Sequence, residues 1–93
     1  MIKHIVLWKL HDRASAPVMK AALEALPAVI PVIGKIEVGI NFEPGAAMAD
    51  VALYSEFANL ADLEAYMKHP EHLKVVALIR PLVSERRVTD YEI

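Results

Sequence analysis

The sequence has no cysteine, no cluster of basic residues and no long hydrophobic run. Without cysteine the chain can form no disulfide, and it offers neither a thiol nucleophile nor a thiolate metal ligand. Ten Lys and Arg residues against twelve Asp and Glu residues leave a formal net charge of −2, so we expect no nucleic-acid partner. The apolar runs fall far short of the ~20 residues that a membrane span needs, and the first residues lack the pattern of a signal peptide. We therefore expect a cytoplasmic protein without a membrane partner.

Apolar residues are what the chain has in excess. They make up 56% of its 93 residues, whereas soluble domains usually have roughly 45–50%. A chain of this length forms one domain and buries only about 60–65% of the surface of its unfolded form, so a monomer would be marginally stable. An apolar excess in so small a domain indicates that a partner covers part of the surface. We expect a single domain over residues 1–93, without repeats or linkers, that forms a homodimer.

The spacing of apolar residues predicts the order β-α-β-β-α-β. Strands are expected over residues 2–11, 34–42, 50–57 and 83–92, a helix from 15 to a stop between 27 and 31, and a second helical region over 59–80 that restarts at 70. Ser15 and Asn59 are expected to cap the two helical regions, and His69 to cap the restart before Pro70. The order is that of the ferredoxin-like α+β fold, a four-stranded antiparallel sheet with helices on one face.

The first strand is apolar on both faces, which is typical of a strand in the interior of a sheet. His4, Val6 and Trp8 share one face, and Ile5 and Leu7 share the other. If helices cover one face of the sheet, the other face exposes a hydrophobic patch to water. Two such sheets packed face to face, ~10 Å apart, would bury it. We therefore expect a homodimer through the sheet face with a shared, barrel-like core.

His72 is the most informative single residue. Val75, Val76 and Ile79 follow it at helical spacing, so its side chain is expected to point inward with theirs. An inward imidazole titrates near neutral pH and needs a polar partner. Two interpretations stay open, a hydrogen-bonded core residue or a working group in a pocket.

Segments distributed over the whole chain carry a family resemblance. They are Lys3–Lys9, Ile36–Asn41, Tyr54–Phe57, Tyr66–Val76 with its His69-Pro70-Glu71-His72 motif, and Arg87–Tyr91. Together they resemble the stress-responsive A/B barrel domain family, Dabb, whose name records stress-associated expression. The resemblance implies a ferredoxin-like protomer that dimerises through its sheet into an α+β barrel, in agreement with the arrangement expected from the apolar pattern.

Within this family the chain is distantly similar to plant polyketide cyclases of the olivetolic acid cyclase type. These close a linear polyketide by aldol condensation in a cavity between helices and sheet, without a metal or an organic cofactor. The resemblance implies His72 and Tyr66 as the catalytic acid/base pair and His4 as a pocket residue. Asp50 stands where the cyclases have a further pocket histidine, which implies a different substrate. Trp8 shares the strand face of His4 and is a candidate either for core packing or for the wall of the same cavity.

His69 and His72 are three residues apart, and with His4 or Asp50 they would make a set of metal ligands. We expect no metal site, because His69 is assigned to a helix cap and the Glu of a His-Glu-x-x-His helix is missing.

Arg86 and Arg87 in the last strand are expected to form cross-strand or inter-subunit pairs with Glu56, Glu85 or Asp90. Exposed pairs of this kind contribute only ~0–1 kcal/mol.

Three functions fit these features. The first is a small dimeric barrel protein that binds a hydrophobic carbonyl compound in a His/Tyr pocket and cyclises or isomerises it as a cofactor-free lyase or isomerase. The second is a non-catalytic, stress-related dimerisation module. The third is an enzyme like the cofactor-independent monooxygenases that share the dimeric barrel, which rests on fold analogy alone. Substitution of His72 by alanine discriminates the first two, since a pocket residue is needed for ligand binding and a purely structural one for folding.

Overall fold

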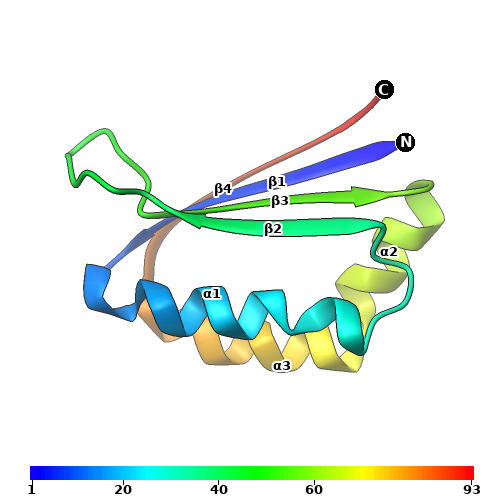
Figure 1. Cartoon of the computed structure of the whole chain (residues 1–93), viewed down its shortest axis with the longest axis horizontal. Helices are drawn as coiled ribbons and strands as arrows, with labels where there is room; N and C mark the ends of the chain where they lie inside the picture. The colour runs from blue at the N-terminus through cyan, green and yellow to red at the C-terminus, as the bar shows by residue number, and fades with distance from the viewer.

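The chain folds into a four-stranded antiparallel sheet with its helices on one face (Figure 1). The computed structural model describes residues 1–93. Along the chain the elements are β1 (Ile2–Leu10), α1 (Ala16–Glu24), β2 (Lys35–Ile40), β3 (Val51–Phe57), α2 (Leu60–Lys68), α3 (Pro70–Ile79) and β4 (Val83–Glu92). The ferredoxin-like α+β arrangement predicted from the sequence is thus confirmed.

β1 lies in the interior of the sheet, whose strand order is β2-β3-β1-β4. On β4, the residue opposite His4 is Asp90 and the residue opposite Trp8 is Arg86. Residues directly opposite each other on antiparallel strands point to the same face. The register therefore decides which side chains of β4 reach the space beneath the helices.

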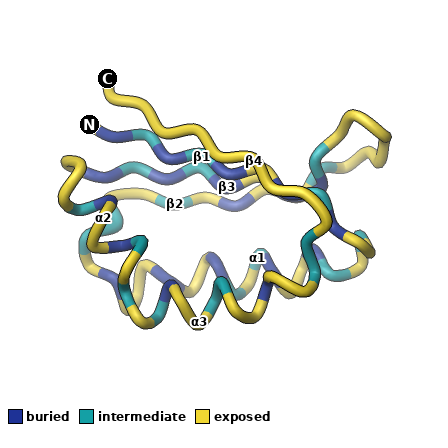
Figure 2. The backbone as a smooth tube through the Cα atoms, turned by 180° about the vertical axis from the view of Figure 1, so that it is seen from behind, coloured by how far each residue is buried: buried dark blue, intermediate teal, exposed yellow.

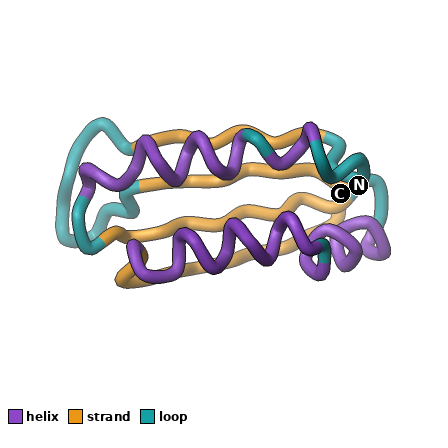
Figure 3. Tube along the Cα trace, turned by 90° about the horizontal axis from the view of Figure 1, so that it is seen from below, coloured by secondary structure: helices purple, strands orange, loops and turns teal.

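The hydrophobic core lies between the sheet and the helices (Figure 2). Alternate residues of β1 and β3 are buried, because successive side chains of a strand point to opposite faces. α1 and α3 lie side by side over the sheet and run along its strands (Figure 3). At the centre of the core, Phe57, Met19 and Ile30 are completely buried. β4 differs from the other strands, because it stands at the edge of the sheet and is exposed from Ser84 onward.

The first helix begins and ends differently from the prediction. Ser15 makes no capping hydrogen bond through its side chain. Asp12 caps the segment instead: its Oδ1 accepts a hydrogen bond of 2.9 Å from the backbone N–H of Ala14 and begins a 3-10 turn that leads into α1. α1 also stops earlier than expected, and a 3-10 turn containing Pro27 follows, because proline has no N–H with which to continue the α-helical bonds. None of the helices is long and apolar enough to cross a membrane.

The break between α2 and α3 lies where the sequence predicted it. Asn59 caps α2 and His69 caps α3, each by accepting a hydrogen bond from a backbone N–H two or three residues further along the chain. Pro70 follows as the first residue of α3, a position at which its missing N–H is harmless. The chain changes direction here, so Tyr66 near the end of α2 faces His72 in the first turn of α3.

The face of the sheet away from the helices is only partly apolar. Lys3 Nζ donates to the Tyr54 hydroxyl at 2.6 Å and to the Glu56 carboxylate at 2.8 Å. Next to this polar group, Ile5 is half-buried and Leu7 is 41% exposed. The expected hydrophobic patch is therefore confined to the middle of this face and is bordered by charged side chains.

Candidate active site

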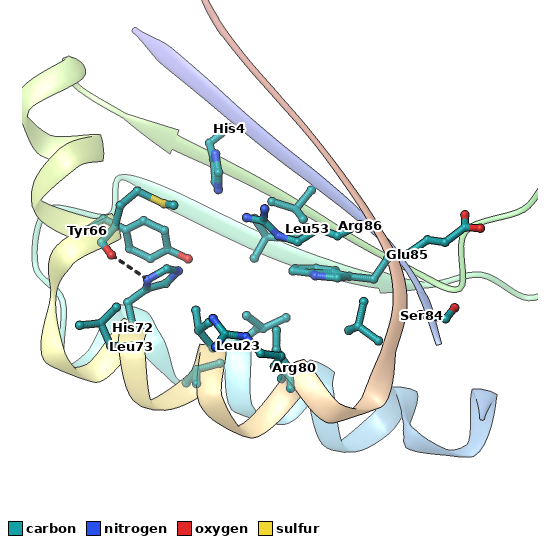
Figure 4. A pocket seen from close by; sticks show the side chains of 17 residues that line it. His4, Leu23, Leu53, Tyr66, His72, Leu73, Arg80, Ser84, Glu85 and Arg86 are labelled. Atoms are coloured by element: carbon teal, nitrogen blue, oxygen red, sulfur yellow. Dashed lines mark hydrogen bonds between the residues drawn. The ribbon is translucent and has the colours of Figure 1, made fainter. Parts of the chain in front are cut away.

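A pocket of about 490 Å³ lies between the helices and the β1–β4 side of the sheet (Figure 4). β1, β3, β4 and all three α-helices contribute to its wall, and most of the lining side chains are hydrophobic. The volume falls within the range of roughly 300–1,000 Å³ that small-molecule sites occupy in proteins. The pocket has room for a small apolar compound.

His4, Tyr66 and His72 form a row of rings on the pocket wall. The ring centroids of Tyr66 and His72 are 4.4 Å apart, and those of His4 and Tyr66 are 6.1 Å apart. Phe57 packs against this row, with its centroid 5.0 Å from that of Tyr66. In Figure 4 the Tyr66 hydroxyl points into the pocket close to the His72 ring. The break at Pro70 thus brings together two polar rings that the sequence separates by six positions.

The hydrogen bond of His72 assigns its proton. A contact of 3.2 Å joins Nδ1 to the backbone carbonyl of Met67. A carbonyl oxygen only accepts, so Nδ1 carries the proton and Nε2, at the opposite edge of the ring, keeps a free lone pair. Burial lowers the pKa of His72 below its usual 6.5, and the charge of Arg86 acts in the same direction, while the Met67 hydrogen bond opposes them. A neutral imidazole of this kind can act as a general base at neutral pH.

Tyr66 is the complementary donor. Burial raises the pKa of its phenol to about 12, although the positive charge of Arg86 partly offsets the effect. The phenol therefore stays protonated at physiological pH and can donate a hydrogen bond to a ligand oxygen. A neutral base beside a hydrogen-bond donor is the arrangement needed to remove a proton next to a carbonyl group.

A carboxylate that the sequence did not mark as a site residue orients His4. Nδ1 of His4, which is 2% exposed, donates to the carboxylate of Asp90 on β4. A carboxylate only accepts, so this contact fixes the proton on Nδ1. In the sequence, Asp90 is one of several polar residues on an edge strand, and its role appears only when β4 is aligned against β1.

The cross-strand ion pairs expected for Arg86 and Arg87 do not form within the chain. Asp90 contacts His4, and Glu56 pairs with a lysine of β1. Arg86 lines the pocket instead, because its position opposite Trp8 turns it toward the helices.

Of the two other expected pocket residues, Trp8 lines the pocket and Asp50 lies outside it. Trp8 is 4% exposed and lines the pocket. Asp50 does not line it: its carboxylate accepts a hydrogen bond of 2.8 Å from the Leu10 backbone N–H and one of 2.9 Å from Arg13. The Leu10 hydrogen bond, assisted by Arg13, lowers the pKa of Asp50. The structure therefore places Asp50 at a structural contact beside the end of β1, apart from the other expected site residues.

The histidines have separate partners. His69 uses its Nδ1 to cap α3, and His72 uses its Nδ1 to bind the Met67 carbonyl. No group of three or more His, Cys, Asp or Glu side chains is arranged to hold a metal ion. The polar groups that the pocket offers to a ligand are two imidazoles, a phenol, the guanidinium of Arg80 and the polar side chains at its β4 rim.

Comparison with known proteins decides the family. The family model of the stress responsive A/B barrel domain, Dabb, matches residues 2–93. The chain belongs to the Dabb family. The resemblance drawn from the separate segments is thereby confirmed. No curated protein matches this Dabb domain by sequence.

Solved structures similar to this Dabb domain include proteins of unknown function and a hydroxynitrile lyase. A dimeric protein of unknown function with a ferredoxin-like fold from Bacteroides fragilis NCTC 9343 is 44% identical, with a TM-score of 0.88 over 99% of this chain and 95% of the other. A dimeric ferredoxin-like protein of unknown function from Thermobifida fusca is 26% identical, with a TM-score of 0.86 over 99% and 90% of the two chains. The hydroxynitrile lyase of Passiflora edulis is 20% identical, with a TM-score of 0.85 over 99% and 92%, and shows similarity of fold alone. None of these relationships assigns a reaction, because proteins of one fold carry out many different functions.

Proposed function

We propose that this Dabb domain acts as a homodimer that binds a small hydrophobic carbonyl compound and isomerises or cyclises it without a cofactor. The observation that carries the proposal is the hydrogen bond between His72 Nδ1 and the Met67 carbonyl. It leaves Nε2 as a free base in a pocket that also holds the hydroxyl of Tyr66.

The chemistry begins with proton transfer. His72 Nε2 takes a proton from the carbon next to the ligand carbonyl, and the electron pair of that C–H bond moves into the enolate, whose charge is carried by the carbonyl oxygen. Tyr66 donates a hydrogen bond to this oxygen. The enolate then either takes the proton back on its opposite face or at a different, conjugated carbon, which isomerises the ligand, or attacks a second carbonyl of the same molecule, which closes a ring. In both outcomes the proton held by His72 returns to the product, so the imidazole is regenerated.

The apolar wall supports this assignment. Val75, Val76 and Ile79 of α3 line the pocket opposite Leu53 of β3. In surroundings that exclude water, the hydrogen bond from Tyr66 to a developing negative charge is stronger than it would be in solvent. The same side chains supply surface for the hydrocarbon part of a ligand.

Binding can be measured through Trp8, which is the only tryptophan and lines the pocket. Titration with methyl heptyl ketone is expected to change the fluorescence of Trp8 in a saturable way. Val76→Phe fills part of the pocket and is expected to weaken binding about tenfold or more, since even one methylene in a close-fitting pocket changes affinity by ~10-fold. Leu78→Phe, on the exposed side of α3, is the matched control and should bind as the wild type does.

A wild-type protein without a saturable response would contradict the binding proposal and favour a non-catalytic dimerisation module. A Val76→Phe variant that binds as tightly as Leu78→Phe would place the ligand outside this pocket.

The dimer is proposed to form through the open face of the sheet. Ile5 lies on the interior strand, on that face, between Tyr54 and Thr89. Ile5→Asp would place two carboxylates into a symmetric sheet-to-sheet contact, where burial of unpaired charge is strongly unfavourable. We expect the dissociation constant of the dimer to rise about 100-fold or more, measured by sedimentation velocity over a range of concentrations. Val18→Asp on the exposed side of α1 is the control. If Ile5→Asp remains as dimeric as Val18→Asp, the sheet face is not the interface.

A further inference from the structure

Two arginines interrupt the apolar lining of the pocket. Arg80 follows the end of α3, and Arg86 lies on β4. None of the five side-chain ion pairs in the structure involves either residue. Figure 4 shows the Arg86 side chain reaching across the pocket, while the carboxylate of its neighbour Glu85 points away from it. The pocket lining therefore contains two guanidinium groups that form no ion pair with a carboxylate of this chain.

The strand register determines this position of Arg86. It lies opposite Trp8 of β1, on the face that the helices cover, whereas Arg87 points to the open face. Its charge influences both Tyr66 and His72, lowering the pKa of each. Arg86 is thus near the proposed reacting groups, at the β4 side of the same pocket.

We propose that the ligand of this pocket carries a carboxylate as well as a carbonyl group, and that Arg86, with Arg80 at the rim, binds the carboxylate. This inference rests on the proposed function of the site. A guanidinium presents a planar set of donors that matches the two oxygens of a carboxylate, and it stays charged at every physiological pH. The ligand class is therefore a hydrophobic oxo acid, with its carbonyl at Tyr66 and its carboxylate at Arg86.

The test compares oxo acids with neutral analogues. Levulinate, its longer methyl-ketone homologues and the methyl ester of each are titrated against the wild-type protein, with Trp8 fluorescence as the readout. At least one acid is expected to bind about 10- to 100-fold more tightly than its own ester, the usual effect of a charge-assisted hydrogen bond. The preference should shrink as the ionic strength rises, because the two charges are partly exposed to solvent.

Variants of one strand supply matched controls. Arg86→Met keeps the apolar stem and is expected to abolish the preference for the acid without weakening ester binding. Arg86→Lys keeps the charge and should retain part of the preference, whereas Arg87→Met, on the other face, should retain all of it. Acid and ester that bind equally to the wild type, or a preference that survives in Arg86→Met, would overturn this inference while leaving the proposed function in place. If neither the acids nor the esters nor methyl heptyl ketone bind, both proposals fail.

Discussion

Substitution of His72 by glutamine is expected to lower the rate at which the protein exchanges the α-protons of a bound ketone by about 10²–10⁴-fold, the usual contribution of a positioned general base. The glutamine amide is close in size to imidazole and can still donate to the Met67 carbonyl, as Nδ1 of His72 does. It has no basic lone pair, so it cannot accept the proton. The rate is measured by proton NMR as the incorporation of deuterium into methyl heptyl ketone in D₂O.

His11→Gln is the matched control, because His11 is exposed just after β1 and does not line the pocket. It should exchange protons at the wild-type rate. A thermal unfolding curve of His72→Gln that resembles the wild-type curve shows that the fold is intact. If a folded His72→Gln protein exchanges the α-protons at the wild-type rate, His72 is not the base and is a hydrogen-bonded core residue instead.

The pH dependence of the same reaction follows from the two shifted groups. Because burial lowers the pKa of His72 below 6.5, the rate is expected to rise with pH through a midpoint below that value. It should then stay level, because Tyr66 remains protonated up to about pH 12. The stability of the protein should also increase with pH in this range. The unfolded chain binds a proton at His72 more readily than the folded protein does, so the free energy of unfolding should fall as the pH decreases below 6.5.

Substitution of Asp50 by alanine is expected to lower the free energy of unfolding by about 3 kcal/mol, because a buried N–H loses its acceptor and a charged hydrogen bond is lost. The Asp50 side chain is 3% exposed and accepts from both the Leu10 backbone and Arg13. The alanine variant leaves the Leu10 N–H without this partner beside the end of β1. Urea denaturation followed by circular dichroism measures the change, and ligand binding by the folded variant should be unaffected.

Two further substitutions separate the causes of this loss. Asp50→Asn keeps an oxygen for the Leu10 N–H but removes the charge that Arg13 contacts, so an intermediate loss is expected. Glu64→Ala on the exposed side of α2 should change stability by no more than about 0.5 kcal/mol. Because the folded protein lowers the pKa of Asp50, the contribution of the charge is complete above about pH 4 and is lost as the pH falls through the lowered value. If the Asp50→Ala variant is as stable as the wild type but no longer binds the ketone, Asp50 is a ligand-binding residue and not a structural one.

The element order, the interior position of β1 and the caps at Asn59 and His69 could all be predicted from the sequence. Each depends on local spacing, since apolar periodicity records which side of an element is buried and a cap involves residues only two or three positions apart. The inward direction of His72 followed from the same periodicity. Its pairing with Tyr66 was implied only by the family resemblance, because the turn at Pro70 had to bring the two rings together.

Tertiary structure alone decided what surrounds these rings. The contact of His4 with Asp90, the direction of Arg86 into the pocket and the position of Asp50 outside it all depend on how strands far apart in the sequence are aligned. A shift of one residue in that alignment would turn every side chain of β4 to the opposite face. Local patterns in β4 contain no information that fixes the alignment, because all of its residues after Val83 are exposed and show no apolar alternation. The sequence by itself therefore determined the scaffold and the central histidine, and the packing of the strands determined the charges around it.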